Sequence, residues 1–176
     1  LPRVVVRPRD TEQLVAVFPD FDQNHGIIRG LPEWYDGAPL GTHVVSVTDE
    51  HGKNVPYDDG TSVDGEKQVK IGDGDVYQHG LTSYTIRYTM RDVVHRPTDR
   101  KIDEWYWDLL PLNSSQPIAK FTGELRFAPQ VGTALTGDHA CYVGPAGSTA
   151  ACALEPAGDG TGFRIAQSNI PAGSGI

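Results

Sequence analysis

Three side chains with complementary chemistry lie close together near the start of the chain. Asn24, His25 and Arg29 supply an amide, an imidazole and a guanidinium within one short segment. Such groups suit contacts with a carboxylate, a phosphate or a sugar. The alternative is structural, with Gly26 at positive φ in an ordered loop and Arg29 paired with a carboxylate such as Glu104. The predicted ligand-binding residues are Asn24, His25, Arg29 and Glu104.

An aromatic block, Asp-Glu-Trp-Tyr-Trp-Asp, occupies residues 103–108. Aromatic rings that stack on a sugar, beside carboxylates that accept its hydroxyl groups, would form a carbohydrate platform. In a strand, however, Trp105 and Trp107 point to one face and Tyr106 to the other, so at least one face is expected to be core. The two acidic residues at the start of the block point apart as well, which makes them a poor acid–base pair for glycoside hydrolysis.

The other ionisable residues form no recognised catalytic or metal-binding pattern. The six histidines include no HExxH pair, and the sequence has no GxSxG elbow, Walker loop or GxGxxG motif. The acidic residues between positions 58 and 75 suit Ca²⁺ by type, but Tyr77 occupies a position where an EF-hand needs a ligand. We therefore predict no catalytic residue, no metal and no cofactor. A hydrolase with a dispersed site and a Ca²⁺-binding domain remain as alternatives.

Length and charge limit the classes of partner. The chain has 176 residues, which suits one domain over 1–176, and a formal net charge of −8. It has no basic tract, so nucleic acid and anionic membrane surfaces are not expected partners. The 20 glycines and 13 prolines predict many turns and no long helix. No apolar run reaches the length of a membrane span.

Alternating segments predict the elements that position these residues. Apolar and polar side chains alternate along residues 84–91 and 121–127, which is typical of half-buried antiparallel strands. Further strands are expected at 44–48, 68–71 and 163–165. Residues 11–14 could open a short helix, but residues 14–18 suit a strand equally well. Short strands separated by turn signals predict an all-β, immunoglobulin-like two-sheet sandwich that is mainly antiparallel.

The composition changes towards the C-terminus. Residues 131–162 are rich in Gly, Ala, Thr and Pro and contain both cysteines, Cys141 and Cys152. The intervening Gly and Pro let the chain turn back, so a disulfide can close this loop in an oxidising compartment. Two reduced, buried thiols are the alternative, and zinc is not expected because neither cysteine belongs to a C-x-x-C pair. The tail, 170–175, reads as the start of a linker.

Several motifs occur in an order that resembles a known family. They are Asn24-His25-Gly26 to Pro32, Val69 to Asp73, Gln78-His79-Gly80 to Tyr88, Asp103 to Asp108, Gln116-Pro117-Ile118, and Cys141 to Cys152. In this order they resemble the exported N-terminal domain of the predicted membrane proteins grouped as domain of unknown function 2207 (DUF2207, YciQ-like). The resemblance runs from about residue 22 to 171, while Leu1 to Phe18 matches only loosely.

The resemblance implies a signal peptide, this all-β domain outside the cytoplasm at the bacterial cell surface, and transmembrane helices elsewhere in the full-length protein. It implies no known activity. We therefore expect a non-enzymatic, extracytoplasmic module of a membrane-anchored protein that binds a protein partner, an envelope polymer or a small ligand. A structural or assembly role, with self-association along an exposed sheet edge, is the alternative.

Overall fold

The computed structural model describes residues 9–35, 37–99, 101–112, 114–158 and 160–176. The described residues form antiparallel β-strands and one helical turn, so the predicted all-β class is confirmed. The chain divides into two compact units, Leu1–Tyr106 (unit 1) and Trp107–Ile176 (unit 2). One domain can contain two such units, so the single domain expected over 1–176 stays a prediction.

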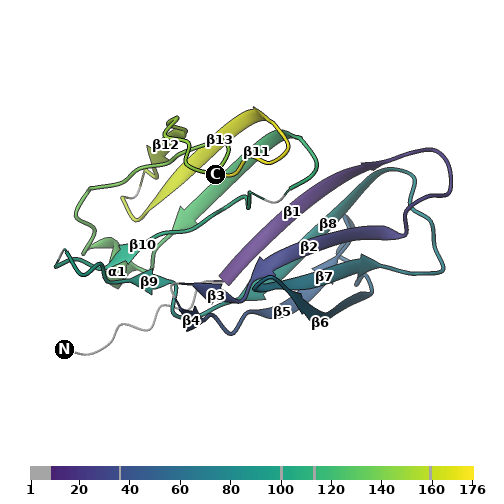
Figure 1. The fold of residues 1–176 in the computed structure, drawn as a ribbon, viewed down its shortest axis with the longest axis horizontal. Coiled ribbons are helices and arrows are strands. Elements are labelled where there is room, and N and C mark those ends of the chain that lie inside the picture. The colour runs from purple at the N-terminus through teal and green to yellow at the C-terminus, as the bar shows by residue number, and fades with distance from the viewer. Residues whose placement is uncertain (1–8, 36, 100, 113, 159) are drawn as a thin grey trace. The chain divides into compact units, whose positions relative to one another are not determined.

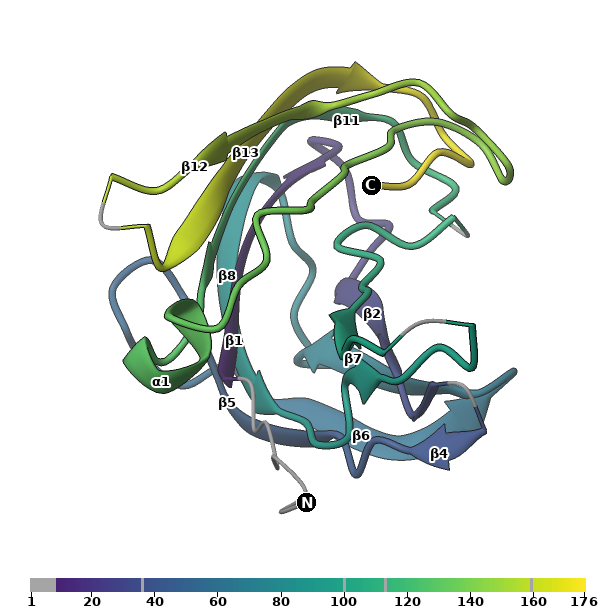
Figure 2. The ribbon, with the colours of Figure 1, turned by 90° about the vertical axis from the view of Figure 1, so that its left-hand side faces the viewer.

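Unit 1 contains two three-stranded antiparallel sheets, which can be followed in Figures 1 and 2. Sheet A has the order β1 (Arg9–Phe18), β8 (Gly80–Thr89), β5 (His43–Thr48). Sheet B has the order β2 (Gly26–Pro32), β7 (Glu66–Gly72), β6 (Tyr57–Val63). The strands expected at 44–48, 68–71 and 84–91 are therefore present, with boundaries that differ by a few residues.

The sequence allowed a short helix or a strand within residues 11–18, and the structure of β1 distinguishes the two. β1 pairs with β8 in an unbroken register from Arg9↔Thr89 to Phe18↔Gly80, so this segment is a strand and not a helix. Its even-numbered residues lie on the same face as Tyr84, Ile86 and Tyr88, which are buried. Residues 1–8, the rest of the loosely matching Leu1–Phe18 segment, lie outside the described residues.

The core of unit 1 receives apolar side chains from both sheets. The alternation of buried and exposed residues along β8 is the pattern expected for a strand with one solvated face. β-Branched and aromatic residues predominate at the buried positions, as their strand preference predicts. The buried apolar residues of the two sheets are Phe18, Leu31, Val44, Val47, Val69, Ile71, Tyr84, Ile86 and Tyr88.

The aromatic block is only briefly a strand. Short antiparallel pairs join β3 (Trp34–Tyr35) to β4 (Ala38–Pro39), and β9 (Val94–His95) to β10 (Glu104–Trp105). Tyr106 is exposed and its ring stacks on that of Tyr35, with ring centroids 6.2 Å apart and planes 14° apart. Trp105 and Trp107 are half-buried. The opposite environments of Tyr106 and the two tryptophans agree with the alternation expected from the sequence.

Unit 2 contains one three-stranded antiparallel sheet of order β11 (Ile118–Arg126), β13 (Gly162–Ile170), β12 (Ala153–Pro156), together with the helical turn α1 (Pro129–Gly132) (Figure 1). Ile165, Ile170 and Ile176 form its buried cluster. Phe121, Leu154 and both cysteines are among the partly buried side chains that pack against this cluster. The strands predicted at 121–127 and 163–165 are thus β11 and β13.

The predicted linker at 170–175 is wrong. The Gly173 N–H donates to the Ser114 carbonyl at 2.8 Å, and Gly144 and Gly175 exchange backbone hydrogen bonds of 3.1 and 2.9 Å. Ile176 is buried in the unit 2 core. These contacts hold the tail against unit 2, so its Gly, Pro and Ser residues form close-packed turns rather than a free connection.

Candidate functional site

Two neighbouring strands meet through glycines at one end of sheet B. Gly26 opens β2 and pairs with Gly72, the last residue of β7. Their φ angles are 153° and 136°, where side-chain-bearing residues are rare. A Cβ atom on Gly26 would overlap the carbonyl oxygen of Ile71, and one on Gly72 would overlap that of His25. Glycine is therefore required at both positions for the strands to approach this closely.

The segment that follows β7 folds back over the start of β2. The Gln78 N–H donates to the Asn24 carbonyl oxygen at 2.8 Å. The rings of His25 and Tyr77 pack together, with centroids 4.1 Å apart and an angle of 30° between their planes. His25 Nδ1 is buried and has no hydrogen-bond partner among the described protein atoms. Two predicted site residues, Asn24 and His25, are thus brought against a segment about fifty residues further along the chain.

Residues 22–26 and 72–79, called here the loop cluster, contain parts of three sequence motifs, two of which lie about fifty residues after the first. His79 Nε2 lies 3.1 Å from Asp22 Oδ1, which ties the far end of the cluster to its beginning. Both of these side chains are largely exposed, so their pairing contributes little to stability. The loop cluster therefore collects imidazole, amide and carboxylate groups at one end of unit 1.

A surface depression of about 500 Å³ adjoins the loop cluster and lies on sheet B. Ile28, Lys70 and Asp58 are direct cross-strand neighbours on β2, β7 and β6, and all three are exposed. Tyr57 and the Gly26–Gly72 pair also line it. This sheet B depression thus combines apolar side chains, one cation, one carboxylate and a stretch of side-chain-free backbone.

The third predicted site residue, Arg29, is engaged inside unit 1. Its Nε and Nη2 atoms lie 2.7 and 2.8 Å from the two carboxylate oxygens of Glu12, which is a bidentate pair. The two side chains are only 14% and 20% exposed. Because Glu12 is in β1 and Arg29 in β2, this ion pair joins sheet A to sheet B. The carboxylate partner suggested from the sequence, Glu104, instead lies in β10 opposite His95.

Glu12 was not predicted as a site residue. It lies on the inward face of β1, and a signal for it existed in the even spacing of Glu12, Leu14 and Phe18. That spacing becomes informative only when the segment is known to be a strand, because a helix would distribute these residues differently. Because a helix at 11–14 was also possible, Glu12 could not be identified from the sequence as the partner of Arg29.

Electrostatics favour the charged form of Arg29 and the neutral form of Tyr88. The Tyr88 hydroxyl donates to Glu12 Oε1 at 2.7 Å. Burial lowers the pKa of Arg29, but its hydrogen bond to Glu12 and the charge of Glu12 outweigh burial, so the pKa lies above its ordinary value. Burial first, and then the charges of Glu12 and Asp10, raises the pKa of Tyr88. Tyr88 therefore stays a neutral donor and Arg29 a cation.

Asp10 is a second acidic residue of β1, and one of its carboxylate oxygens has no partner. It lies directly opposite Tyr88 in the β1–β8 register, on the same face as Glu12. Its Oδ2 atom is buried without a hydrogen-bond partner. Burial, followed by the nearby charge of Glu12, raises the pKa of Asp10 from 3.8 to about 6. Glu12 thus has an arginine as its partner, whereas the buried Oδ2 atom of Asp10 has no hydrogen-bond partner.

Asp10→Asn is expected to stabilise the protein at pH 7.5 and to leave it unchanged near pH 3.5. A carboxyl group whose pKa is raised by folding binds more protons in the native than in the unfolded state, so stability falls as pH rises from 3.8 to about 6. The shift corresponds to about 3 kcal/mol, which partial solvent screening reduces to about 2 kcal/mol. Urea unfolding of parent and variant across this pH range measures the gain.

The exposed residue Asp20 supplies the matched control, since Asp20→Asn removes a carboxylate in the same unit without burial. Its effect on the free energy of unfolding should stay within about 0.5 kcal/mol at every pH. A gain for Asp10→Asn that is equal at pH 3.5 and pH 7.5 would contradict the assignment, because it would not depend on the charge of Asp10.

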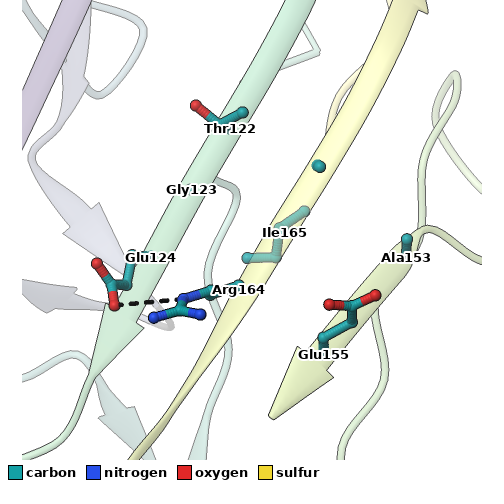
Figure 3. A pocket seen from close by; sticks show the side chains of 8 residues that line it. Thr122, Gly123, Glu124, Ala153, Glu155, Arg164 and Ile165 are labelled. Carbon is teal, nitrogen blue, oxygen red and sulfur yellow. Dashed lines mark ion pairs between the residues drawn. The ribbon is translucent and has the colours of Figure 1, made fainter. Parts of the chain in front are cut away.

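A second depression, of about 490 Å³, lies on the sheet of unit 2 (Figure 3). A row of charged side chains, Glu124, Arg164 and Glu155, crosses its three strands in register. Figure 3 shows Arg164 reaching towards Glu124, and its Nε atom lies 3.7 Å from Glu124 Oε1. Both side chains are largely exposed, so this pair is a solvated surface contact that stabilises by about 1 kcal/mol at most.

Cys141 and Cys152 lie at disulfide distance within unit 2, with their Cα atoms 5.3 Å apart. The Cys152 N–H donates to the Cys141 carbonyl at 3.0 Å, and the Val143 N–H donates to the Ala150 carbonyl at 2.8 Å. The loop between the cysteines is therefore a short hairpin-like turn. The surrounding Gly- and Ala-rich region, 131–162, also contains part of α1 and all of β12.

Comparison with known proteins identifies the family of this chain. The family model described as predicted membrane protein (DUF2207) N-terminal domain matches residues 11–176, which confirms the resemblance seen in the motifs. No curated protein and no solved structure gives a match. Among the described residues no group of three His, Cys, Asp or Glu side chains is placed to hold a metal ion, and none of their helices has the length and hydropathy of a membrane span. The chain belongs to the DUF2207 family of predicted membrane proteins and corresponds to their N-terminal domain.

Proposed function

We propose that this chain is a non-enzymatic binding module, outside the cytoplasm, of a membrane-anchored protein. Its ligand or partner would bind at the sheet B depression and the adjoining loop cluster. The two sheets of unit 1 would form an immunoglobulin-like sandwich, a fold that commonly presents binding residues at one end. Membership of a predicted membrane protein family supports the anchored context.

The observation that carries the proposal is the meeting of three sequence motifs around the paired glycines, Gly26 and Gly72. Unusual backbone conformations cluster at binding and active sites, and binding residues are often carried by loops, so the positive-φ glycines beside this depression support a recognition role. The buried Nδ1 atom of His25, which has no protein partner, also lies here. Unsatisfied buried polar atoms are rare, and one that lies beside a depression can be satisfied by a bound ligand.

The chemistry of the depression suits a ligand with both apolar and polar groups. Ile28 and Tyr57 offer apolar surface, while Lys70 and Asp58 offer a donor and an acceptor on adjacent strands. Gly26 lines the depression without a side chain, so a flat group can approach its half-buried backbone closely. An envelope glycan or a peptide segment of a partner protein has these properties, whereas nucleic acid is disfavoured by the net charge of −8.

The proposal rests on Asn24 and His25 among the predicted site residues. Arg29 is held by Glu12, and its role as a ligand contact stays a prediction. The same applies to Glu104, whose strand β10 lies outside the sheet that forms the depression. A ligand that needed a cation here would find Lys70, which is exposed, rather than Arg29.

A ligand screen tests the proposal directly. The 176-residue chain would be screened by thermal shift against soluble envelope glycan fragments, envelope peptides, small anions and Ca²⁺. A ligand present at one hundred times its dissociation constant adds about 2.7 kcal/mol of stability, which such a screen detects. We expect a glycan or peptide to bind, and expect Tyr57→Ala and Lys70→Ala each to weaken that binding by about tenfold, or 1.4 kcal/mol.

Arg164→Ala, in the unit 2 depression, is the matched control, since it removes an exposed cation from a cavity of similar volume. It should leave the affinity unchanged. Binding that is lost in Arg164→Ala but retained in Tyr57→Ala and Lys70→Ala would move the site to unit 2. The proposal fails if no glycan and no peptide in the screen binds.

A further inference from the structure

The outward face formed by residues 11–17 of β1 and 81–87 of β8 is almost free of charge. Its strands β1 and β8 alternate, so the residues that do not share the face of buried Tyr84 and Ile86 point to solvent. These outward residues are Thr11, Gln13, Val15 and Val17 in β1, and Leu81, Ser83, Thr85 and Arg87 in β8. Arg87 is the one charged residue among them, although 22% of the chain is charged. Solvated surfaces normally mix charges of both signs, so this sheet A face is atypical.

Large apolar side chains gather at one end of the sheet A face. Val17 and Leu81 are directly opposite each other in the β1–β8 register and are 79% and 76% exposed. Val15, two residues earlier on the same face, is 61% exposed. Single exposed apolar residues are ordinary, but a contiguous group of three on a flat sheet marks a surface that another molecule covers.

β1, the strand that carries Val15 and Val17, is also a regular sheet edge. Within the described strands, β1 hydrogen-bonds only β8, and their register has no bulge over its whole length. Of the other edge strands of sheets A and B, β5 and β6 are interrupted in register, whereas β2 pairs with β7 without a shift. The pairing of β5 shifts between Val44 and Ser46, that of β6 shifts between Asp58 and Thr61, and β2 ends at Pro32. Such interruptions protect sheet edges from pairing with further strands.

The charged residues of β1 are confined to its first half. Asp10 and Glu12 point inward, where an edge strand can use charge to prevent pairing. Residues 13–18, Gln-Leu-Val-Ala-Val-Phe, carry no charge, no proline and no glycine. Their composition has the high strand preference and low polarity of segments that pair with other strands.

We propose that residues 13–18 of β1 are a self-association site, at which a second copy of this chain pairs with the same segment in antiparallel orientation. The two A sheets would then join into one six-stranded sheet about a two-fold axis. In an antiparallel register that keeps the faces aligned, Gln13, Val15 and Val17 of one copy lie beside the same set of the other. The apolar groups of both copies become continuous.

Charge indicates that this face is where a second copy can approach most easily. Each chain carries a net charge of −8, so two copies repel each other across most of their surfaces. The outward residues of β1 and β8 include no carboxylate, so this face lets two copies approach with the least repulsion. Anchoring in a membrane, as the family membership indicates, would confine copies to a plane and raise their effective concentration. This site is separate from the sheet B depression and does not depend on it.

Sedimentation equilibrium of the whole 176-residue chain tests the inference. We expect a monomer–dimer equilibrium with a dissociation constant of about 0.1 mM or below, and at least a tenfold weakening in Val15→Lys and in Val17→Lys. Val63→Lys is the matched control, because Val63 is an exposed valine on β6, an edge strand of sheet B. It should dimerise like the parent.

Folding of each variant is checked by thermal unfolding at a concentration where the parent is monomeric. Gln13→Lys, which replaces one exposed polar residue by another, serves if a valine variant loses structure. A parent chain that remains monomeric up to about 1 mM overturns the inference. So does a dimer that persists in folded Val15→Lys and Val17→Lys, or one that Val63→Lys weakens equally.

Discussion

Replacement of Arg29 by methionine is expected to destabilise the protein by about 3–5 kcal/mol. The change leaves the Glu12 carboxylate, which is 20% exposed, without the cation that now binds both of its oxygens. An uncompensated charge in such an environment costs more than the loss of the pair itself. The remaining donor, the Tyr88 hydroxyl at 2.7 Å, satisfies only one oxygen of Glu12.

Urea unfolding at pH 7 measures this loss, and two variants interpret it. Glu12→Gln combined with Arg29→Met removes both charges and should recover part of the stability, because methionine fills the volume of the arginine stem without a charge to satisfy. Arg87→Ala, in β8, removes an exposed arginine from the same unit and should cost about 0.5 kcal/mol or less. An Arg29→Met variant as stable as Arg87→Ala would show that the ion pair is not structural, and would return Arg29 to the candidate ligand contacts.

The same ion pair shows what the sequence could and could not predict. The alternation of residues 84–91 and 121–127 needs only neighbouring positions, and both segments are strands. The partner of Arg29 depends on the pairing of β1 with β8, between segments about seventy residues apart. The local pattern was compatible with a short helix beginning at residue 11 and with a strand, and only the strand puts Glu12 on the inward face. Tertiary pairing, rather than local preference, therefore fixes the ion pair.

The loop cluster was predicted in part for a related reason. Asn24-His25-Gly26 could be recognised as a turn with useful side chains, because glycine in such a segment signals unusual backbone geometry. Its proximity to Tyr77 and Gln78 follows from the pairing of Gly26 with Gly72, which leaves no signal in local composition. The sheet B depression needs three strands in register and was not foreseen.

The linker predicted from composition at the C-terminus was wrong for a different reason. A linker and a packed turn both use Gly, Pro and Ser, because both need chain reversal or freedom from side chains. The distinguishing feature is close approach: a Cβ on Gly175 would come within 2.5 Å of the Leu110 carbonyl oxygen. Ile176, an apolar residue after the glycines, packs into the unit 2 core with Ile165 and Ile170.

Reduction of the purified, oxidised chain is expected to lower its stability by about 3 kcal/mol. The loop between Cys141 and Cys152 has a sequence separation of 11, and opening it restores conformational freedom to the unfolded state. Both cysteines also pack against the buried cluster of unit 2, so two separated thiols would disturb that packing. Thermal and urea unfolding with and without a phosphine reductant measure the difference.

Hydrogen exchange shows where the loss occurs. Amides of the Cys141–Cys152 turn and of its neighbour β13 should exchange faster after reduction, while β7 and β8 of unit 1 keep their protection. A variant with both Cys141→Ala and Cys152→Ala should be as unstable as the reduced parent and insensitive to reductant. If the reductant destabilises that variant as well, its effect does not act through this pair. Two titratable thiols in chain refolded under oxidising conditions would establish the reduced alternative, and the requirement for an oxidising compartment would then no longer follow from these cysteines.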